Sequence, residues 1–553
     1  MDNQYTLGID YGTLSVRTVL MNCTDGEIAA VSSMAYPHAV MDQVLPDGRT
    51  MLPANWALEY PDDYLEVLEH TVREVMDQSG IRPEDVIGLS IDFTSCTMVA
   101  ADENKRALCS LEEFRSRPHA YAKLWKHHGA QDEADEINEV LTELGLIHQP
   151  RYGGAVSPEL LLPKILEILH DDPQIYERAS VFMEAGDWLT WNLTGKLKRS
   201  GNMAAYKAWW TPEEGYVPQQ VLEALDGRLK DLIPCKLRGE ICPAGGCIGT
   251  LTEEWAARLS LRSGIAVGAG IIDAHAGMPG SGIYRPGQLM LVLGTSSVEL
   301  LLSDRPYADH GVMGNVRGAI MPGYYSLEAG LAAVGDMYGW FVDGLVPEAY
   351  AQRAREKGMN LHQYLSALAQ ELRPGASGLL ALDWWNGNKT PYVNGDLSGV
   401  LMGLTLQTRP EEIYRALIEA NAFGTRMIME EFMKSGAVVD EVIVSGGIAQ
   451  KNPFVLRVFT DVLNRPVRIS ASDQTAAVGS AMYAAAAAGV EAGGYATVAD
   501  ASRALARLKE EVYEPDPEHA QIYDDLYALY KEAVSVFDPK VKGILKSLKT
   551  MRK

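Results

Sequence analysis

Two short segments of the sequence have the composition of phosphate-binding hairpins. Residues 7–17 read LGIDYGTLSVR and residues 291–299 read LVLGTSSVE, so an apolar run enters a hydroxyl-rich Gly-Thr turn in each. Glycine lets backbone N–H groups approach an anion closely, and Thr and Ser hydroxyls add donors. One copy alone is a common tight turn. Two copies, one in each half of the chain, predict two hairpins that hold one polyphosphate from opposite sides.

Two carboxylates stand at positions suited to phosphate chemistry. Asp10 lies in the first hairpin, where a phosphate-bound Mg²⁺ would need an oxygen ligand. Asp273 follows the apolar run 264–272 and precedes the small residues AHAG, which should open a helix. There a carboxylate can point into a cleft and accept the proton of an alcohol, although Asp before a helix is also a frequent N-cap. The sequence contains neither a Walker A loop nor a dinucleotide-binding fingerprint.

Composition limits the class of protein. The chain has 553 residues, 47% of them hydrophobic, which predicts more than one domain with sizeable cores. A net charge of -24 disfavours nucleic acid and anionic membranes as partners. The six cysteines form no CxxC pair and are expected to be free thiols. The N-terminus does not resemble a signal peptide and no apolar run reaches membrane-spanning length, so a cytoplasmic protein is expected.

Periodicity predicts an α/β protein with two domains. The patterns indicate a hairpin and a third strand over 5–36, then an amphipathic helix, a buried strand and a polar turn over 93–96. Further elements are expected as a helix over 61–78, a strand over 86–92, helices over 326–345, 410–435 and 473–488, a strand over 441–445, and a helical tail from 499. A Gly/Pro-rich run near 280–288 sets the boundary. The expected domains are 1–284, with a helical insert at about 110–245, and 285–553.

These motifs together resemble the FGGY family of carbohydrate kinases, over roughly residues 5–490. The resemblance rests on GIDYGT at 8–13, GIIDAHAGMPG at 270–280, LGTSS at 293–297, GVLMGLTLQTRPEEIYRALIE at 399–419 and SGGIAQKN at 445–452. The segment 157–169 keeps Pro158 and Lys164 of another family signature but lacks its Trp. Membership implies the two-domain actin-like ATPase fold of actin, Hsp70 and hexokinase, with a ligand cleft between the domains.

The resemblance implies transfer of the ATP γ-phosphate to a sugar hydroxyl, with Asp273 as the catalytic base. Asp10 is expected to hold Mg²⁺ through water. The other residues expected at the nucleotide are Gly12, Thr13, Ser15, Arg17, Gly294, Thr295, Gly335, Gly446, Gly447 and Asn452. The alternative interpretation of Arg17 is an ordinary exposed strand residue, and that of Asn452 is a helix N-cap. Gly446 and Gly447 are expected to let adenine lie flat on the backbone.

The sugar is expected to contact Lys207 and Glu328, charged residues set among apolar and aromatic neighbours, together with Asp273. An ordinary salt bridge is the alternative for this Lys/Glu pair. Ser95 and Cys96 are expected to line the same site, through backbone contacts rather than thiol chemistry. His275 stays outside the catalytic set, because a buried, hydrogen-bonded histidine explains it equally well.

Within the family, the segments 91–102, 202–210, 273–280 and 328–343 are similar to those of L-ribulose kinases. The implied reaction is phosphorylation of L-ribulose to L-ribulose 5-phosphate in L-arabinose catabolism. Kinases of D-ribulose, ribitol or xylulose are the near alternatives, and a non-catalytic nucleotide switch is the distant one. Expected partners are the sugar and ATP. Relatives often form dimers, which leaves the oligomeric state open.

Overall fold

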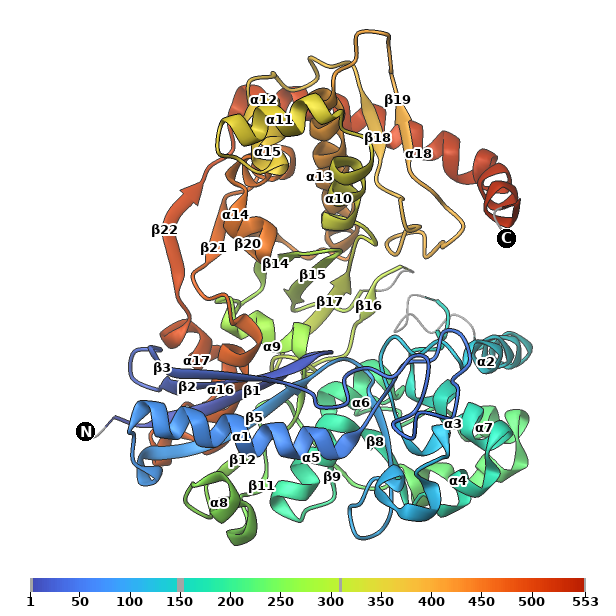
Figure 1. Cartoon of the computed structure of the whole chain (residues 1–553), viewed down its shortest axis with the longest axis vertical. Coiled ribbons are helices and arrows are strands. Elements are labelled where there is room, and N and C mark those ends of the chain that lie inside the picture. Colours follow the sequence, from blue (N-terminus) through green and yellow to red (C-terminus); the bar gives the residue numbers. More distant parts are fainter. Residues whose placement is uncertain (1–2, 147–153, 308–310, 552–553) are drawn as a thin grey trace. The chain divides into compact units, whose positions relative to one another are not determined.

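The computed structural model describes residues 3–146, 154–307 and 311–551 (Figure 1). Its contacts divide the chain into two compact units that do not follow chain order. The first consists of Met1–Tyr284, Gly314–Ser326 and Gln474–Arg507, and the second of Arg285–Met313, Leu327–Asp473 and Leu508–Lys553. The first break in the chain falls at the predicted boundary. The predicted C-terminal domain, 285–553, is however divided, because two of its segments pack in the first unit.

The first unit is built on a mixed sheet. Its strands are β1 (Tyr5–Tyr11), β2 (Ser15–Asn22), β3 (Ile28–Ala35), β5 (Val86–Phe93), β11 (Cys247–Thr250), β12 (Ala266–Gly268) and β13 (Ile271–Ile272). The order is β11-β12-β5-β1-β2-β3, with β13 also paired to β5. Strands β1, β12 and β13 run parallel to β5, whereas β1, β2 and β3 form an antiparallel meander. The predicted hairpin and third strand are therefore confirmed.

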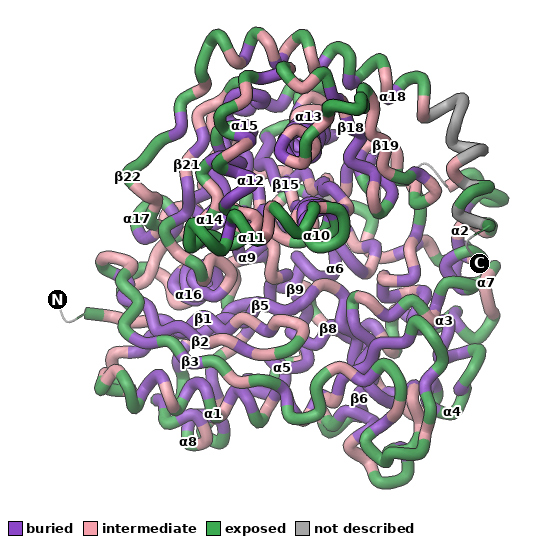
Figure 2. The backbone as a smooth tube through the Cα atoms, turned by 45° about the horizontal axis from the view of Figure 1, so that its top comes forward, coloured by how far each residue is buried: buried purple, intermediate pink, exposed green. Residues whose placement is uncertain are grey.

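Helices cover this sheet at very close range. Helix α1 (Pro61–Ser79) turns its apolar positions inward, and α16 (Thr475–Ala488) packs against β1 and β5. A side chain at Gly8 would place its Cβ 1.8 Å from the Ala477 carbonyl oxygen, so only glycine permits this helix–strand distance. Figure 2 shows α16 and β5 among the buried segments. Helices α8 (Glu253–Leu259), α9 (Asp273–Gly280) and α17 (Val498–Leu505) complete this part of the unit.

The insert after β5 is largely helical, as predicted. Its helices are α2 (Gln131–Glu143), α3 (Leu161–Asp171), α4 (Pro173–Arg178), α5 (Ala185–Thr194), α6 (Gly201–Lys207) and α7 (Gln219–Leu225). Small sheets join them, made of β4 (Leu58–Glu59), β7 (Ala122–Lys123), β6 (Met98–Ala101) and β8 (Val181–Glu184), and of β9 (Lys198–Ser200) with β10 (Glu240–Cys242).

The second unit repeats the hairpin-plus-parallel-strand pattern. Its strands are β14 (Gly287–Leu293), β15 (Ser297–Ser303), β16 (Met313–Gly314), β17 (Tyr325–Ala329), β20 (Val439–Ser445), β21 (Val467–Ser470) and β22 (Leu508–Tyr513), in the order β16-β17-β15-β14-β20-β21-β22. The pair β14–β15 is an antiparallel hairpin, and β14, β20 and β21 are parallel. A further pair is β18 (Leu380–Leu382) with β19 (Val400–Met402).

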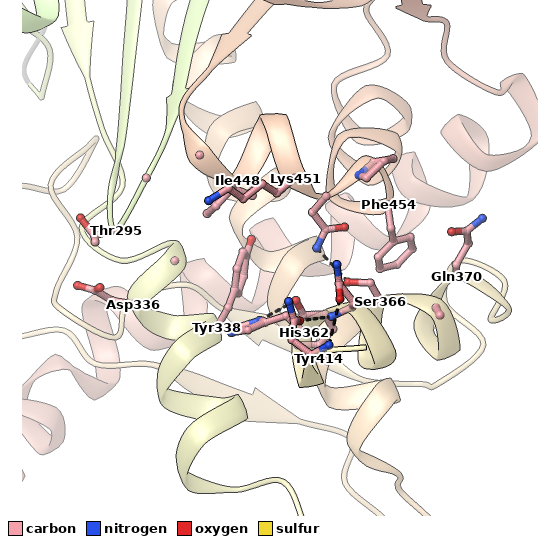
Figure 3. Close-up of a pocket in the computed structure, with 18 residues that line it drawn as sticks. Thr295, Asp336, Tyr338, His362, Ser366, Gln370, Tyr414, Ile448, Lys451 and Phe454 are labelled. Carbon is pink, nitrogen blue, oxygen red and sulfur yellow. Dashed lines mark hydrogen bonds between the residues drawn. The ribbon is translucent and has the colours of Figure 1, made fainter. Parts of the chain in front are cut away.

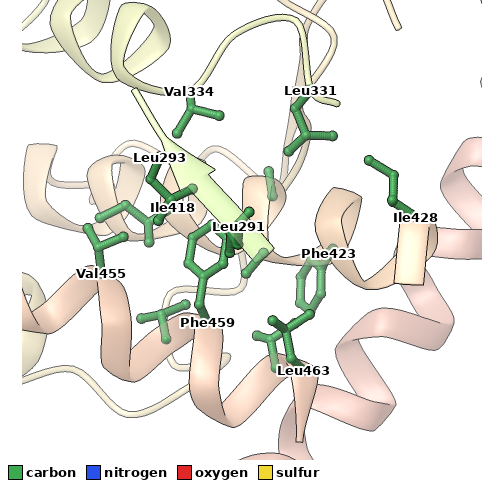
Figure 4. Close-up of a cluster of buried hydrophobic side chains, with 14 of the residues drawn as sticks. Leu291, Leu293, Leu331, Val334, Ile418, Phe423, Ile428, Val455, Phe459 and Leu463 are labelled. Atoms are coloured by element: carbon green, nitrogen blue, oxygen red, sulfur yellow. The ribbon is translucent and has the colours of Figure 1, made fainter. Parts of the chain in front are cut away.

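Helices pack on this second sheet to form its core. They are α10 (Gly335–Gly344), α11 (Glu348–Glu356), α12 (Leu361–Gln370), α13 (Pro410–Lys434), α14 (Gly447–Lys451), α15 (Pro453–Leu463) and α18 (Pro517–Met551). Figure 4 shows Leu291 and Leu293 of β14 against Phe423 of α13 and Phe459 of α15, all of them buried. Burial of such side chains stabilises the unit by about 1.5–3 kcal/mol each.

Two segments differ from the predicted secondary structure. The helix predicted over 326–345 begins only at Gly335, because residues Tyr325–Ala329 form β17 beside β15. The tail predicted as helical from residue 499 contains β22, which pairs antiparallel with β21. In both cases pairing with an available sheet edge outweighs the local preference for helix.

The titration of Glu299 in β15 gives a stability prediction. This carboxyl is 0% exposed, and its Oε1 accepts hydrogen bonds from Ser297 Oγ at 2.9 Å and Thr425 Oγ1 at 3.1 Å. Burial raises the pKa of Glu299 from 4.5 to about 7, against the effect of these hydrogen bonds. An acid with a raised pKa in the folded state contributes full stability below pH 4.5, which is lost as the pH rises through about 7.

Glu299 should lower the unfolding free energy of the wild type by up to about 3 kcal/mol between pH 4.5 and 7.5. We expect Glu299→Gln to remove this fall. Denaturant titrations of variant and wild type at several pH values measure how the unfolding free energy of each protein changes with pH. This change does not depend on a constant difference in stability between the two proteins. Parallel curves for variant and wild type would show that Glu299 is ionised at the same pH in both states.

Candidate active site

Three carboxylates meet at one edge of the first sheet. In the parallel register Asp10 of β1 is the partner of Asp92 of β5, and Ile272, the last residue of β13, is the partner of Phe93. Asp273 follows directly, so Asp10, Asp92 and Asp273 stand at the carboxyl ends of neighbouring parallel strands. Ligands of open α/β sheets bind at this edge.

Asp10 has both a cationic and an acidic neighbour. The antiparallel register places Arg17 of β2 opposite Asp10, and the Arg17 Nη1 and Asp10 Oδ2 atoms are 3.6 Å apart. Burial raises the pKa of Asp10, while a hydrogen bond with Asp92 and the charge of Arg17 act in the opposite direction. Arg17 thus faces the carboxylate expected to hold the metal, rather than acting only as an exposed strand residue.

Asp92 is a site residue that the sequence analysis did not single out. It is fully buried, and its Oδ2 accepts a hydrogen bond from Ser480 Oγ of α16 at 2.6 Å. Among the described residues its Oδ1 has no hydrogen-bond donor. Burial, and then the charges of Asp10 and Asp273, raise the pKa of Asp92 well above its usual value. A signal was present, since Asp92 ends the predicted buried strand just before the polar turn.

Asp273 is the first residue of α9, and its Oδ1 accepts a hydrogen bond from the Ala274 N–H at 2.7 Å. The N-cap position belongs to Ile272, so the N-cap alternative for Asp273 does not hold. His275 is 1% exposed, and its Nδ1 lies 2.9 Å from Asn202 Nδ2. Because the Asn202 Oδ1 also accepts a hydrogen bond from the Ile272 N–H, this buried histidine belongs to the support of the strand end.

The first predicted phosphate hairpin closes as a tight turn. Gly12 N–H donates to the Ser15 carbonyl at 3.0 Å, and the hydroxyl of Thr13 accepts a hydrogen bond from Trp125 Nε1 at 3.1 Å. Thr13 and Ser15 are both partly exposed. Trp125, which carried no signal in the sequence, therefore approaches this loop from the insert.

One of the predicted sugar residues of the first unit, Cys96, contacts a buried lysine. Lys164 Nζ donates to the carbonyl oxygens of Cys96 at 2.6 Å and Leu124 at 2.7 Å, which holds the turn after β5, where Cys96 has φ +54°. Burial raises the pKa of the Cys96 thiol far above its usual value, so this thiol stays neutral. Lys207 ends α6 at 8% exposure and Ser95 is partly exposed. Glu328 lies in β17 of the other unit, and its pairing with Lys207 stays a prediction.

The second unit contains a pocket of about 910 Å³ (Figure 3). Five of the predicted nucleotide residues line it, namely Gly294, Thr295, Gly335, Gly447 and Asn452. The remaining lining residues are Asp336, Tyr338, Asn360, His362, Gln363, Ser366, Ala367, Gln370, Tyr414, Ile448, Lys451, Pro453 and Phe454. In Figure 3, Thr295 and Asp336 lie at one end, and Gln370 and Phe454 at the other. The wall made by α12 carried no motif and was not predicted.

The second hairpin is joined to α10 by backbone contacts. The Val334 N–H donates to the Thr295 carbonyl at 2.8 Å, and the Gly335 N–H donates to the Gly294 carbonyl at 3.0 Å. A Cβ at Gly335 would lie 2.7 Å from that Gly294 oxygen. Glycine at 335 is therefore required for the close approach of α10 to the hairpin.

The two glycines expected under the adenine differ in role. Gly447 lines the pocket, and a Cβ there would have no atom within 4 Å, so the space in front of it is open. Gly446 is not among the lining residues, has φ +95°, and would place a Cβ 2.4 Å from the Leu293 carbonyl oxygen. Gly446 thus turns the chain tightly beside β14, and its contact with adenine stays a prediction.

Asn452 is the N-cap of α15 and also lines the pocket, and its contact with the base stays a prediction. As N-cap of α15 its Oδ1 accepts a hydrogen bond from the Val455 N–H at 3.4 Å. Its Nδ2 donates to Ser366 Oγ of α12 at 2.9 Å, and the side chain lines the pocket.

Comparison with known proteins agrees with this architecture. A model of the N-terminal domain of the FGGY family of carbohydrate kinases matches residues 5–280, and one of the C-terminal domain matches residues 289–488. The chain belongs to the FGGY family of carbohydrate kinases, as its motifs predicted, and it is a kinase whose phosphoryl donor is ATP.

Among named relatives the chain is similar to ribulokinases. It is 45% identical to the ribulokinase of Anoxybacillus flavithermus over 549 residues, which cover 99% of this chain and 97% of the relative. It is also 45% identical to the ribulokinase of Halalkalibacterium halodurans over 552 residues, covering 100% and 98% of the two chains.

A solved structure shows the same fold. The xylulose kinase of Rhodospirillum rubrum superposes with a TM-score of 0.77 at 24% identity, covering 97% of this chain and 99% of that one. The predicted two-domain actin-like ATPase fold is thereby confirmed. Within the described part of the chain, no helix is both long enough and apolar enough to cross a membrane.

Two of the glycines that line the pocket, Gly447 and Gly335, allow a matched test. Gly447→Ala adds a methyl group at an open position on the pocket wall, so we expect an unchanged melting temperature but a KM for ATP raised roughly tenfold, equivalent to about 1.4 kcal/mol. Gly335→Ala forces a methyl group against the Gly294 carbonyl and should destabilise the protein by about 1–3 kcal/mol. Thermal melting and steady-state kinetics separate the two effects. A Gly447→Ala enzyme with wild-type KM would place the nucleotide elsewhere.

Proposed function

We propose that this kinase phosphorylates L-ribulose with ATP to give L-ribulose 5-phosphate and ADP, as a step of L-arabinose catabolism. The observation that carries the proposal is 45% identity to ribulokinases over 99% of this chain, a match that includes both units and both candidate sites. Action in the cytoplasm belongs to the same proposal, and assembly as a homodimer is the expected form.

Asp273 is the proposed general base. Its carboxylate stands at the carboxyl end of β13, is partly exposed, and is oriented by the Ala274 N–H. The substrate hydroxyl would transfer its proton to this carboxylate while its oxygen attacks the γ-phosphorus and ADP leaves. The Asn202 side chain, which binds both Ile272 and His275, keeps the strand end in place.

The carboxylates at the sheet edge suit Mg²⁺. Asp10 is half-buried beside Asp92, whose buried Oδ1 has no described donor, so a hard cation would find oxygen ligands there. Bound Mg²⁺ would neutralise charge on the β- and γ-phosphates. Among the described residues no three acidic, His or Cys side chains are spaced to hold a metal directly. Mg²⁺ usually keeps several waters and uses one or two carboxylates together with phosphates.

ATP is proposed to occupy the pocket of the second unit. The hairpin at Gly294 and Thr295 would receive the phosphates, and the open space at Gly447, next to Asn452, would receive the adenine. Thr13 and Ser15 of the first hairpin are expected to contact the same polyphosphate.

The sugar is proposed to lie near Lys207, Glu328 and the turn at Ser95 and Cys96. Lys164 acts there as a positioning residue, because its buried ammonium fixes the Cys96 carbonyl and hence the path of the turn. The expectation that Cys96 acts through backbone contacts rather than thiol chemistry agrees with the raised pKa of its thiol.

The proposal is tested by coupled ADP detection with a panel of pentuloses and pentitols. The highest kcat/KM is expected with L-ribulose, and ADP release should be slow without sugar. A clear preference for D-ribulose, ribitol or xylulose would overturn the substrate assignment. ADP release that no sugar accelerates would instead indicate a nucleotide switch.

Asp273→Asn should retain ATP and sugar binding but reduce kcat by about 10²–10⁴, the range typical of losing a general base. Calorimetric binding of both ligands and single-turnover kinetics give the two readouts. Near wild-type kcat would remove Asp273 from the chemistry.

Lys207→Ala and Glu328→Ala should each raise the KM for the sugar by about 10–100-fold, with little change in the KM for ATP, because each loses a charged hydrogen-bonding group. Lys198→Ala is the matched control, since this partly exposed lysine of the insert pairs with Glu240 at 3.2 Å. If the KM for ATP rose more than that for the sugar, these two residues would belong to the nucleotide site.

A further inference from the structure

A chain of polar side chains runs along the wall of the nucleotide pocket. Helix α12 presents His362 and Ser366, one turn apart, and α13 presents Tyr414 between them (Figure 3). Asn452, at the start of α15, completes the group. The links that join neighbouring members are Asn452 Nδ2 to Ser366 Oγ at 2.9 Å and Tyr414 Oη to His362 Nδ1 at 3.2 Å.

The direction of each hydrogen bond follows from its donor and acceptor groups. The Oδ1 of Asn452 accepts from the Val455 N–H, so the amide must turn its NH₂ group toward Ser366. The hydroxyl of the buried Tyr414 lies 3.2 Å from the Nδ1 of His362. A phenol O–H is a stronger donor than a neutral imidazole N–H, and an imidazole nitrogen is a stronger acceptor than a phenol oxygen, so the Tyr414 hydrogen is directed to Nδ1.

This arrangement selects one tautomer of His362. With Nδ1 as an acceptor, the neutral ring carries its hydrogen on Nε2. Burial lowers the pKa of His362, which keeps the ring neutral. Within the described ranges, Nε2 has no hydrogen-bond partner in the protein, although His362 lines the pocket. The pocket thus holds an oriented N–H donor on the wall made by α12, where Figure 3 shows His362 between Thr295 and Gln370.

We propose that His362 reads the base of the nucleotide, with its Nε2–H donating a hydrogen bond to a ring nitrogen of adenine. The inference rests on the proposed function, because it takes this pocket as the ATP site. Adenine offers N1, N3 and N7 as acceptors, and each can be replaced by carbon in a deaza analogue without changing the shape of the base. Tyr414 is the positioning residue that sets the donor.

The test compares binding of ADP and its 1-deaza, 3-deaza and 7-deaza analogues to the full-length protein by calorimetry. For wild type, one analogue should bind about 3- to 10-fold more weakly than ADP, the usual effect of one neutral hydrogen bond. His362→Phe should bind ADP and that analogue equally. His362→Gln, whose amide can place a donor near the position of Nε2, should restore the difference. Thermal melting identifies any variant that fails to fold.

Tyr414→Phe removes the hydroxyl that selects the tautomer but keeps the ring, so the penalty for the analogue should shrink while His362 is still present. His70→Phe, an exposed position on α1, is the matched control and should behave as wild type. If all deaza penalties in His362→Phe equal those of wild type, the proposal is overturned.

Failure of the substrate assignment would be visible separately. A wild-type protein without ribulose-dependent turnover, but with a deaza penalty that disappears in His362→Phe, would refute the proposed reaction and support the base contact. Normal ribulose kinase activity, combined with deaza penalties that do not depend on His362, would support the proposed reaction and refute the base contact.

Discussion

The candidate catalytic site depends on the close packing of α16 in the first unit. This helix meets β1 and α9 backbone to backbone: a Cβ at Gly479 would lie 1.7 Å from the Ala276 carbonyl oxygen, and one at Gly280 would lie 1.9 Å from that of Thr475. At this distance Ser480 reaches the buried carboxylate of Asp92, and α9 is held with Asp273 as its first residue. Any side chain larger than hydrogen at these contacts would move the helices that define the site.

Electrostatic repulsion is the second constraint. Asp10, Asp92 and Asp273 bring three carboxyl groups to one sheet edge in a chain of net charge -24. Arg17 offsets part of this charge at Asp10, and burial, together with the charges of Asp10 and Asp273, raises the pKa of Asp92. A site of this kind favours a bound cation, and the proposed Mg²⁺ would join the carboxylates to the phosphates.

The two units contain similar sheets but differ in what surrounds their hairpins. Each presents a Gly-Thr hairpin next to parallel strands, but the second surrounds its hairpin with helices that leave a large pocket. Two hydrogen bonds in its wall, from Asn452 to Ser366 and between Tyr414 and His362, order these side chains before a ligand arrives. Such pre-organisation reduces the ordering cost of binding.

The sequence alone was sufficient for the features that depend on local patterns. Both hairpins, Asp10 and Asp273 were predictable, because a strand that runs into a Gly-Thr turn or a small-residue helix start is recognisable within about ten residues. The ordered set of motifs also identified the family, which the comparisons confirmed.

Only the tertiary structure decided which distant segments meet. It assigned residues 474–507 to the first unit, made strands of β17 and β22, gave Gly446 a packing role, and brought Asp92 and His362 into their sites. These outcomes depend on which sheet edge is available for pairing and which helix faces meet. Such contacts join residues tens to hundreds of positions apart, and a local pattern cannot encode them.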